Sequence, residues 1–193
     1  MNIKSTPNTR LRTKLQRIST IISGVYARST PVGSIAYLQI KDLMTSSIGT
    51  AATRVEPPQK ITSYLLRKGD LLFAGKGTTH LCKVFDSDIQ AIPSTTLFAI
   101  RPHLDIITPE YLCWYLNHPN VIATIKTTQV GTGTPMIHKS TLENLEIIIP
   151  SKEIQNHIVA LANLQQREDK IIKEIAKKKM QITNQILLNI LNK

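Results

Sequence analysis

The sequence predicts an α/β chain of the α+β type, in which a mixed or antiparallel sheet with short helices is followed by a long C-terminal α-helix. Short segments rich in β-forming residues alternate with glycine- and proline-bearing turns over most of the chain. Hydrophobic residues make up 41% of the 193 residues, which is enough to build a core. From Lys152 to its end the sequence contains no proline or glycine. We therefore predict two parts, a compact domain over residues 1–150 and a helix over residues 151–193.

The first half of the predicted domain contains strands separated by turns. Residues 11–22 carry apolar side chains at a helical or mixed period. Residues 35–43 are rich in β-formers and predict a strand that leads into a turn. Residues 54–59 contain two adjacent prolines and predict a loop. The triplet Lys68-Gly69-Asp70 turns the chain into a short apolar strand over residues 71–74, and a glycine-bearing loop follows.

The second half of the domain is predicted to mix strands with short helices. Residues 83–85 and 96–101 resemble strands, with Ile92-Pro93-Ser94 between them. Thr108-Pro109-Glu110 has the form of an N-cap followed by proline and an acid, which predicts a helix over residues 111–116. Further along the chain the pattern predicts a helix, a loop, a short turn and a final strand, over residues 121–127, 131–135, 139–142 and 145–149 respectively.

The C-terminal segment has an apolar face. Its apolar residues fall mostly three or four positions apart, and we expect them to form a dimer or partner surface: Ile154, Ile158, Leu161, Leu164, Ile171, Ile175, Ile182, Ile186 and Ile190. A continuous helix of this length extends about 60 Å, whereas a domain of this size has a radius of gyration of about 15 Å. The excess stripe therefore predicts a second helix as partner. Glu168 and Lys178 interrupt the stripe, which leaves a bend or short break there open.

The net charge of +11 makes nucleic acid the leading partner, because a basic surface attracts phosphate backbones and releases their counterions. A basic surface that serves solubility alone, or one that binds acidic membranes, is the alternative. The sequence has no apolar run of membrane-spanning length and no apolar signal-peptide region near Met1, so we expect a cytoplasmic protein.

No catalytic or metal site is predicted. Cys82 and Cys113 belong to no CxxC pair, and the histidines are scattered, so no metal cluster or disulfide is expected. The glycine-rich segments at residues 75–80 and 131–136 do not match nucleotide-binding loops. The triplet Glu168-Asp169-Lys170 matches half of a nuclease metal motif but falls on the predicted helix, which favours a solvated face. We therefore expect a non-catalytic protein.

The loops of the predicted domain carry side chains suited to DNA. Such residues donate hydrogen bonds or positive charge to phosphates and base edges. The candidate DNA-binding residues are Arg54, Lys76, Thr78, Thr79, Lys83, Gln129, Thr132, His138 and Lys139. A plain solvated loop residue is the alternative interpretation for each of them.

Four segments in a fixed order carry a family resemblance. They are YLLRKGDLLFAGKG from Tyr64, PEYLCWYLN from Pro109, GTGTPMIHKSTLENL from Gly131 and IPSKEIQNHIVALANLQQ from Ile149. Together they resemble the specificity subunits of type I restriction-modification enzymes, in which a KGD strand, a PEYL helix, a glycine-rich loop and a boundary with glutamine recur in this order. Ser151 stands where a second proline is common.

The resemblance implies a half-length specificity subunit. Family members usually carry two target recognition domains, each followed by a long helix, and this chain resembles one such half with residues 1–150 as the target recognition domain. A homodimer through the C-terminal helices would then read a bipartite, inverted-repeat site on double-stranded DNA. By this resemblance the helices would also dock methyltransferase subunits, which bind S-adenosylmethionine. A restriction subunit that uses ATP and magnesium would join them. The chain itself is expected to hold no cofactor or metal.

Two alternatives stay open at this point. One is an orphan half-subunit that exchanges with, or titrates, a full-length specificity subunit. The other, from a different class, is a small nuclease or RNA-binding enzyme, which would cleave nucleic acid with a metal ion.

Overall fold

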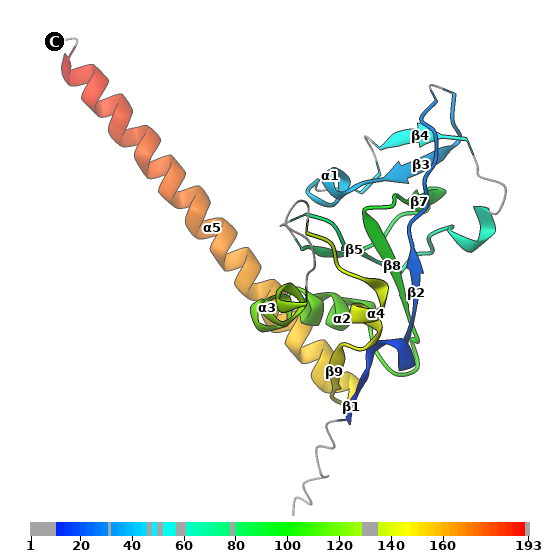
Figure 1. Cartoon of the computed structure of the whole chain (residues 1–193). Helices are drawn as coiled ribbons and strands as arrows, with labels where there is room; N and C mark the ends of the chain where they lie inside the picture. The colour runs from blue at the N-terminus through cyan, green and yellow to red at the C-terminus, as the bar shows by residue number, and fades with distance from the viewer. Residues whose placement is uncertain are drawn as a thin grey trace, which may run out of the picture. The chain divides into compact units, whose positions relative to one another are not determined.

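The computed structural model describes residues 11–30, 32–45, 48–49, 52–56, 61–77, 80–128 and 135–191 (Figure 1). The chain divides into two compact units, Met1–Gln155 and Asn156–Lys193. The first unit combines sheets with short helices, and the second consists of most of one long helix. The α+β class predicted from the sequence is confirmed.

A four-stranded antiparallel sheet forms the largest layer of the first unit. Its strands run in the order β2, β8, β5, β6: β2 (Ser19–Ser23), β8 (Leu97–Pro102), β5 (Leu71–Ala74) and β6 (Cys82–Val84). The central strand β5 is buried over its whole length, which explains why its sequence is continuously apolar. The turn Lys68-Gly69-Asp70 precedes it as predicted, with Gly69 at φ +90°, a conformation that side chains disfavour.

A three-stranded sheet packs near the first one, in the upper part of Figure 1. It consists of β4 (Thr53–Val55), β3 (Ile35–Leu38) and β7 (Ala91–Pro93), with β3 parallel to β7 and antiparallel to β4. Because side chains alternate across a strand, Ala36 and Leu38 join a core cluster with β5 and β8, while Ile35 and Tyr37 join a second cluster with Val55. The strand β3 is therefore buried on both faces. The one-turn helix α1 (Ile40–Leu43) follows it.

The remaining elements of the first unit gather at the other end of Figure 1. They are β1 (Leu11–Lys14), which pairs antiparallel with β9 (Glu146–Ile149), and the helices α2 (Pro109–Leu116), α3 (Pro119–Thr127) and α4 (Lys139–Glu143). The predicted cap of α2 is confirmed, since the Thr108 hydroxyl accepts from the backbone N–H of Tyr111 at 3.3 Å. The Tyr111 hydroxyl donates to the Ile148 carbonyl at 2.7 Å, which fastens α2 to β9.

The prediction of a helical or mixed segment at residues 11–22 was wrong. Strand β1, a 3₁₀ turn (Leu15–Arg17) and strand β2 occupy it. Ser19 and Ile21 are buried while Thr20 is exposed, so β2 follows the two-residue period of a strand. Its partner is β8, with Ile21 opposite Ile100, and this pairing across the chain decides the conformation.

Three smaller predictions are also corrected. Residues 53–55 form strand β4, since Val55 is fully buried against β3, whereas the prolines of the predicted loop lie outside the described residues. Residues 91–93 form strand β7 instead of a connection, and a second short 3₁₀ turn occupies Ile61–Ser63. The predicted turn at residues 139–142 is the helix α4. The predicted loop at residues 131–135 lies mostly outside the described residues.

The helix α5 runs without interruption over 40 residues, Lys152–Leu191. The short break considered near Glu168 and Lys178 is therefore absent from this helix. Its start lies within the first unit, where Gln155 is fully buried. The Gln155 amide donates to the carbonyls of Pro150 and Ile106 at 3.0 and 3.2 Å, and its oxygen accepts from the backbone N–H of Thr108 at 2.9 Å.

Candidate nucleic-acid interface

The loop after β5 brings several of the predicted DNA-binding residues together. Residues 75–77 run beside residues 135–137, because the N–H of Gly77 donates to the Pro135 carbonyl and that of Ile137 to the Gly75 carbonyl, both at 2.9 Å. Lys76 forms an isolated bridge with Met136 in the same place. His138 and Lys139 follow directly along the chain and are exposed.

The other described candidates lie on different elements. Lys83 is on β6, where its ammonium donates to the Thr45 carbonyl. Arg54 is an exposed residue of β4, and its guanidinium donates to the Ser34 carbonyl at 3.4 Å. Lys139 lies 3.5 Å from Glu143 one turn along α4, so its charge is partly neutralised. The remaining candidates lie outside the described residues: Thr78, Thr79, Gln129 and Thr132.

A groove that the sequence did not predict lies at the junction of the two larger sheets. Its volume is about 600 Å³, and its lining consists mainly of hydroxyl-bearing side chains. We call it the hydroxyl groove, and its residues are Tyr26, Ala27, Ser29, Tyr37, Gln39, Ile40, Lys41, Thr53, Ser94, Thr95 and Thr96. The run Ser94-Thr95-Thr96 is the one sequence signal that could have drawn attention to it, since these residues form the turn between β7 and β8.

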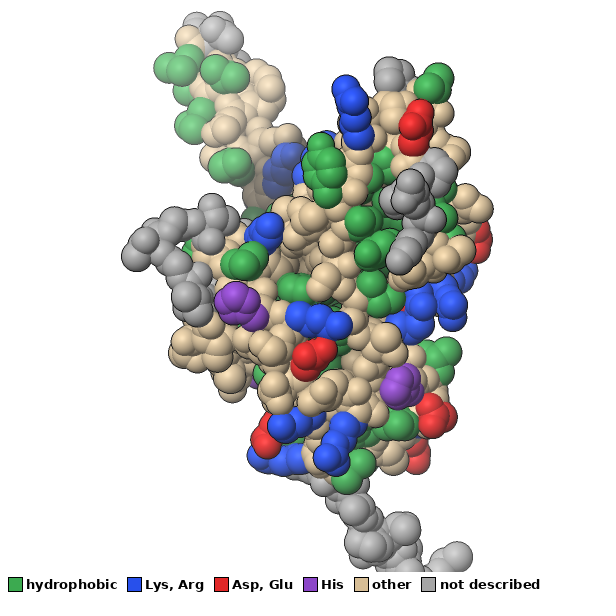
Figure 2. Space-filling view, turned by 45° about the vertical axis from the view of Figure 1, so that its right-hand side comes forward, with side chains coloured by type: hydrophobic (Ala, Val, Ile, Leu, Met, Phe, Trp, Pro, Cys, Tyr) green, Lys and Arg blue, Asp and Glu red, His purple; other side chains and the backbone are tan. Residues whose placement is uncertain are grey.

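Charge favours this groove as a surface for a polyanion. Lys41 is exposed, and no aspartate or glutamate occurs among the residues that line the groove. On the face that Figure 2 shows, lysine and arginine side chains are more frequent than acidic ones and lie in several separate groups. A lysine without a neighbouring carboxylate keeps its full attraction for phosphate.

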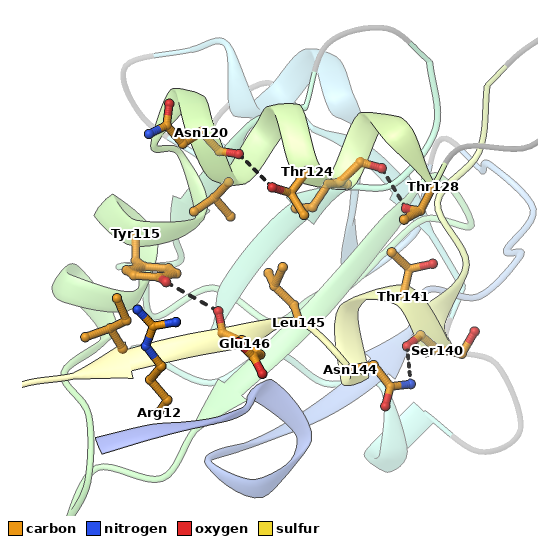
Figure 3. Close-up of a pocket in the computed structure, with 13 residues that line it drawn as sticks. Arg12, Tyr115, Asn120, Thr124, Thr128, Ser140, Thr141, Asn144, Leu145 and Glu146 are labelled. Carbon is orange, nitrogen blue, oxygen red and sulfur yellow. Dashed lines mark hydrogen bonds between the residues drawn. The ribbon is translucent and has the colours of Figure 1, made fainter. Parts of the chain in front are cut away.

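A second cavity of about 710 Å³ lies among β1, β9 and the short helices (Figure 3). Its polar side chains are largely engaged with the protein: the hydroxyls of Thr124 and Thr128 donate to backbone carbonyls at 3.0 and 2.7 Å, and the amide of Asn144 does so at 2.9 Å. Its lining includes Arg12 and one carboxylate, Glu146, but no histidine or cysteine. The cavity therefore offers neither a nucleophile with a base nor a pair of carboxylates.

The buried charged groups of the first unit have structural partners. Asp70, of the KGD turn, is 2% exposed and accepts from Nε and Nη2 of Arg101 at 2.8 and 2.7 Å. It also accepts from the backbone N–H of Arg67 at 2.8 Å. The hydrogen bonds that Arg101 donates to Asp70 raise the pKa of Arg101. This acid therefore ties the KGD turn to β8.

The two cysteines, distant in sequence, meet in the structure. Cys113 of α2 donates its thiol to the carbonyl of Cys82 on β6 at 3.4 Å, and both are free cysteines. Burial raises the pKa of the Cys82 thiol. Among the described residues, no group of three or more histidine, cysteine or acidic side chains is placed to hold a metal ion. No helix in the same part of the chain is long and apolar enough to cross a membrane.

The helix α5 presents an exposed apolar stripe. Ile175, the least exposed of its large apolar residues from Leu161 onward, is 48% exposed, and Leu191 is 80% exposed. The stripe is wider than the sequence predicted and also contains Ile172, Met180, Leu187 and Leu188. Ile154 and Ile158, near the start of the helix, are half-buried. Exposed apolar surface of this extent is typical of a surface that binds a partner.

Comparison with protein families gives one match. The family model for the type I restriction modification DNA specificity domain matches residues 20–191, which include the two larger sheets almost completely and the whole of α5. The resemblance inferred from the order of the motifs is confirmed by this match. None of the curated proteins compared with the sequence is similar to it.

Solved structures share the fold. A chain from a structure on the complex assembly and conformational transition of the type I R-M system aligns with TM-score 0.68 and 21% identity over 89% of this chain. The HsdS subunit from Thermoanaerobacter tengcongensis aligns with TM-score 0.62 and 22% identity over 87%. The S subunit of a type I restriction-modification system from M. genitalium aligns with TM-score 0.59 and 12% identity over 85%. The alignments cover 42%, 40% and 41% of those chains, so this chain spans about two fifths of their length.

Proposed function

The chain belongs to the type I restriction modification DNA specificity domain family, and from this premise we propose that it is a DNA sequence-specificity subunit that binds one half of a bipartite target. The observation that carries the proposal is the extent of the family match, which runs through the sheets and along α5. The net charge of +11 supports DNA as the ligand, because a basic surface gains affinity from counterion release.

We further propose that two copies associate through α5. The stripe around Ile175 and Ile182 needs an apolar partner, and a second copy of the same helix supplies one with the same pattern. Homodimers favour two-fold symmetry, so the paired copies would read the two halves of an inverted-repeat site. That the solved relatives are more than twice as long as the matched region supports a paired arrangement of this kind.

In this proposal the chemistry belongs to other subunits. The specificity subunit selects the DNA site, and methyltransferase and restriction subunits act on it. S-adenosylmethionine, ATP and magnesium would be held by those partners, and this chain would be neither an enzyme nor a cofactor-binding protein. Because its ligand is DNA, we place the protein in the cytoplasm.

Methylation mapping tests the proposal. Genomic DNA is compared between cells that carry the gene and cells that lack it. We expect one inverted-repeat motif to lose adenine methylation when the gene is deleted, and to regain it when the gene is restored. Complementation with Ile182→Lys should fail because the charge lies in the apolar stripe, whereas Lys177→Gln, at an exposed position away from the line of Ile175 and Ile182, serves as the control.

Other outcomes separate the alternatives. Methylation that does not change on deletion contradicts the proposal. If deletion replaces one asymmetric bipartite motif by another, the chain exchanges with a longer specificity subunit. Cleavage of DNA by the purified chain with a metal ion would instead support the nuclease.

A further inference from the structure

We propose that the hydroxyl groove seats one sugar-phosphate strand of duplex DNA, with the Lys41 ammonium against a phosphate and the hydroxyls of Thr53 and Thr95 donating to backbone oxygens. The inference rests on the proposed function, since it names the place on this chain where the DNA backbone is held. None of these three residues is among the DNA-binding candidates predicted from the sequence.

The walls of the groove are held by the fold. The Tyr37 hydroxyl donates to the Val25 carbonyl at 3.0 Å, and the N–H of Ser94 donates to the Leu38 carbonyl at 2.8 Å. The N–H of Val25 also donates to the Pro93 carbonyl at 3.0 Å. At Gly24 a Cβ would lie 1.9 Å from the Ser94 carbonyl oxygen, so the close approach of these two segments requires glycine. The groove is therefore preformed by segments far apart in sequence.

Its hydrogen-bond donors are available to a ligand. Among the described residues, no protein partner is found for the hydroxyls of Thr53 and Thr95 or for the Lys41 ammonium. Ser94 and Thr96 share one hydrogen bond between their hydroxyls at 2.8 Å. Because each hydroxyl carries one proton, that pair retains one O–H to donate outward. Hydroxyl, amide and lysine donors of this kind make the majority of protein contacts to DNA phosphates and sugars.

The second cavity does not share these properties. Its hydroxyls at Thr124 and Thr128 already donate to carbonyls, and the Glu146 carboxylate would repel a phosphate. The hydroxyl groove has no carboxylate in its lining, and among the described residues no partner is found for the Lys41 ammonium or for the hydroxyls of Thr53 and Thr95. Of the two hollows, the hydroxyl groove is the one that fits a polyanion.

The neighbours of the groove fit duplex DNA. The N–H of Gly75 donates to the Thr96 carbonyl at 3.0 Å, so the groove borders the loop that carries Lys76. Tyr26 is 77% exposed and projects at the groove's edge. A concave surface receives a convex backbone strand, whereas base edges lie recessed in the DNA grooves and need protruding groups. The groove would thus position the duplex while the projecting groups beside it approach the bases.

The salt dependence of DNA binding tests the inference. The full chain, with its methyltransferase partner, is titrated against a fluorescein-labelled duplex of random sequence over a range of salt concentrations. The plot of log K against log salt has a negative slope, and loss of one phosphate contact makes this slope shallower by about 0.9. We expect Lys41→Gln to make it shallower by this amount for each groove engaged, at all DNA sequences tested. Thr95→Val removes an uncharged donor, so binding should weaken by about fivefold with an unchanged slope.

Matched controls keep the outcomes separate. Lys68→Gln makes the same change in net charge at an exposed residue whose ammonium already lies 3.0 Å from Asp86, and its slope should equal that of the wild type. Circular dichroism checks that each variant is folded. Equal slopes for Lys41→Gln and the wild type overturn the inference and leave the proposed function standing. If the wild type itself binds no duplex, the proposed function fails first, and binding of RNA alone would overturn both.

Discussion

The interior of the first unit and the stripe of α5 are both apolar, but the interior is buried whereas the stripe is exposed. Leu71, Leu72 and Phe73 on β5 are fully buried between neighbouring strands. On α5, Ile175 and Ile182 are 48% and 61% exposed. The same residue types therefore serve two purposes, a core in the first unit and a surface for association in the second. The difference teaches that a pattern of apolar residues predicts burial without saying which chain provides the cover.

Polar residues show the same contrast. Asp70 and Gln155 are buried in the first unit and each makes several hydrogen bonds. In the described part of the chain, no buried side-chain nitrogen or oxygen lacks a partner. From Asn156 onward the polar side chains of α5 are exposed, and Lys170 and Glu174 form an ion pair at 4.0 Å that solvent screens. Substitution of a buried polar residue should therefore lower the stability of the first unit, whereas substitution in the stripe of α5 should weaken association between chains.

The largest loss of stability is expected for Asp70→Ala. The change leaves the Arg101 guanidinium and the Arg67 N–H without their acceptor. Breaking a buried ion pair costs about 3 kcal/mol or more, and we expect about 3 because Arg101 keeps 25% of its side chain exposed. Urea unfolding measures the difference. Lys68→Ala breaks the exposed ion pair with Asp86 and should leave the midpoint of urea unfolding unchanged. An equal loss of stability in both variants would contradict the expectation that the buried ion pair contributes more than the exposed one.

Next in size is the effect of Ile182→Gln on association. Each buried isoleucine contributes about 1.5 kcal/mol, and a dimer loses two of them, which raises the dissociation constant by about 100-fold. Analytical ultracentrifugation measures this constant. The urea midpoint of the first unit should change little in the monomeric range. Lys177→Gln, at an exposed position away from the line of Ile175 and Ile182, is the control. A dimer that tolerates Ile182→Gln would show that the stripe is not the interface.

A smaller loss is expected for Gln155→Ala. Removing the amide leaves the N–H of Thr108 and the carbonyls of Ile106 and Pro150 without their partner. An unsatisfied buried group costs about 1–3 kcal/mol, and we expect about 2 kcal/mol by urea unfolding. Gln166→Ala, at an exposed position of the same helix, provides the matched control. Identical stability of the two variants would mean that the start of α5 is not held by this side chain.

The last and smallest effect concerns the rate at which a thiol reacts, and no change in the free energy of unfolding is measured. In a Cys113→Ser variant only Cys82 remains, and its burial raises its pKa and lowers its thiolate fraction. Ellman's reagent at pH 8 should react more than about tenfold faster in urea than in the native protein, since reactivity follows the thiolate and its access. Lys177→Cys in the same background places a thiol on exposed α5 and should react at once. Rapid native labelling of Cys82 would show that the first unit opens readily.

Local patterns in the sequence predicted the parts of the fold that depend on neighbouring residues. The strand at residues 71–74, the cap at Thr108 and the long C-terminal helix were all predicted correctly. Each depends on interactions within a few positions, such as the hydroxyl of Thr108 with the N–H of Tyr111 or apolar side chains three and four residues apart. The motif order also led to the correct family.

The residues of the candidate site were harder to predict from the sequence than the fold. Lys76 and His138 lie on segments that the structure brings together, but Arg54 and Lys83 lie on separate strands. These assignments stay predictions. The hydroxyl groove was missed because its residues come from four separate segments, and no local pattern joins Lys41 to Thr95.

The sequence by itself determined the family, the α+β class and the helix with its apolar stripe. Only the tertiary structure decided that residues 19–23 form a strand, that Asp70 forms an ion pair with Arg101, and which hydroxyls line the same groove. The physical reason is the range of the interactions. Helices and caps are stabilised between residues a few positions apart, whereas the pairing of Ile21 with Ile100 or the packing of Gly24 on Ser94 forms only when the whole domain has folded.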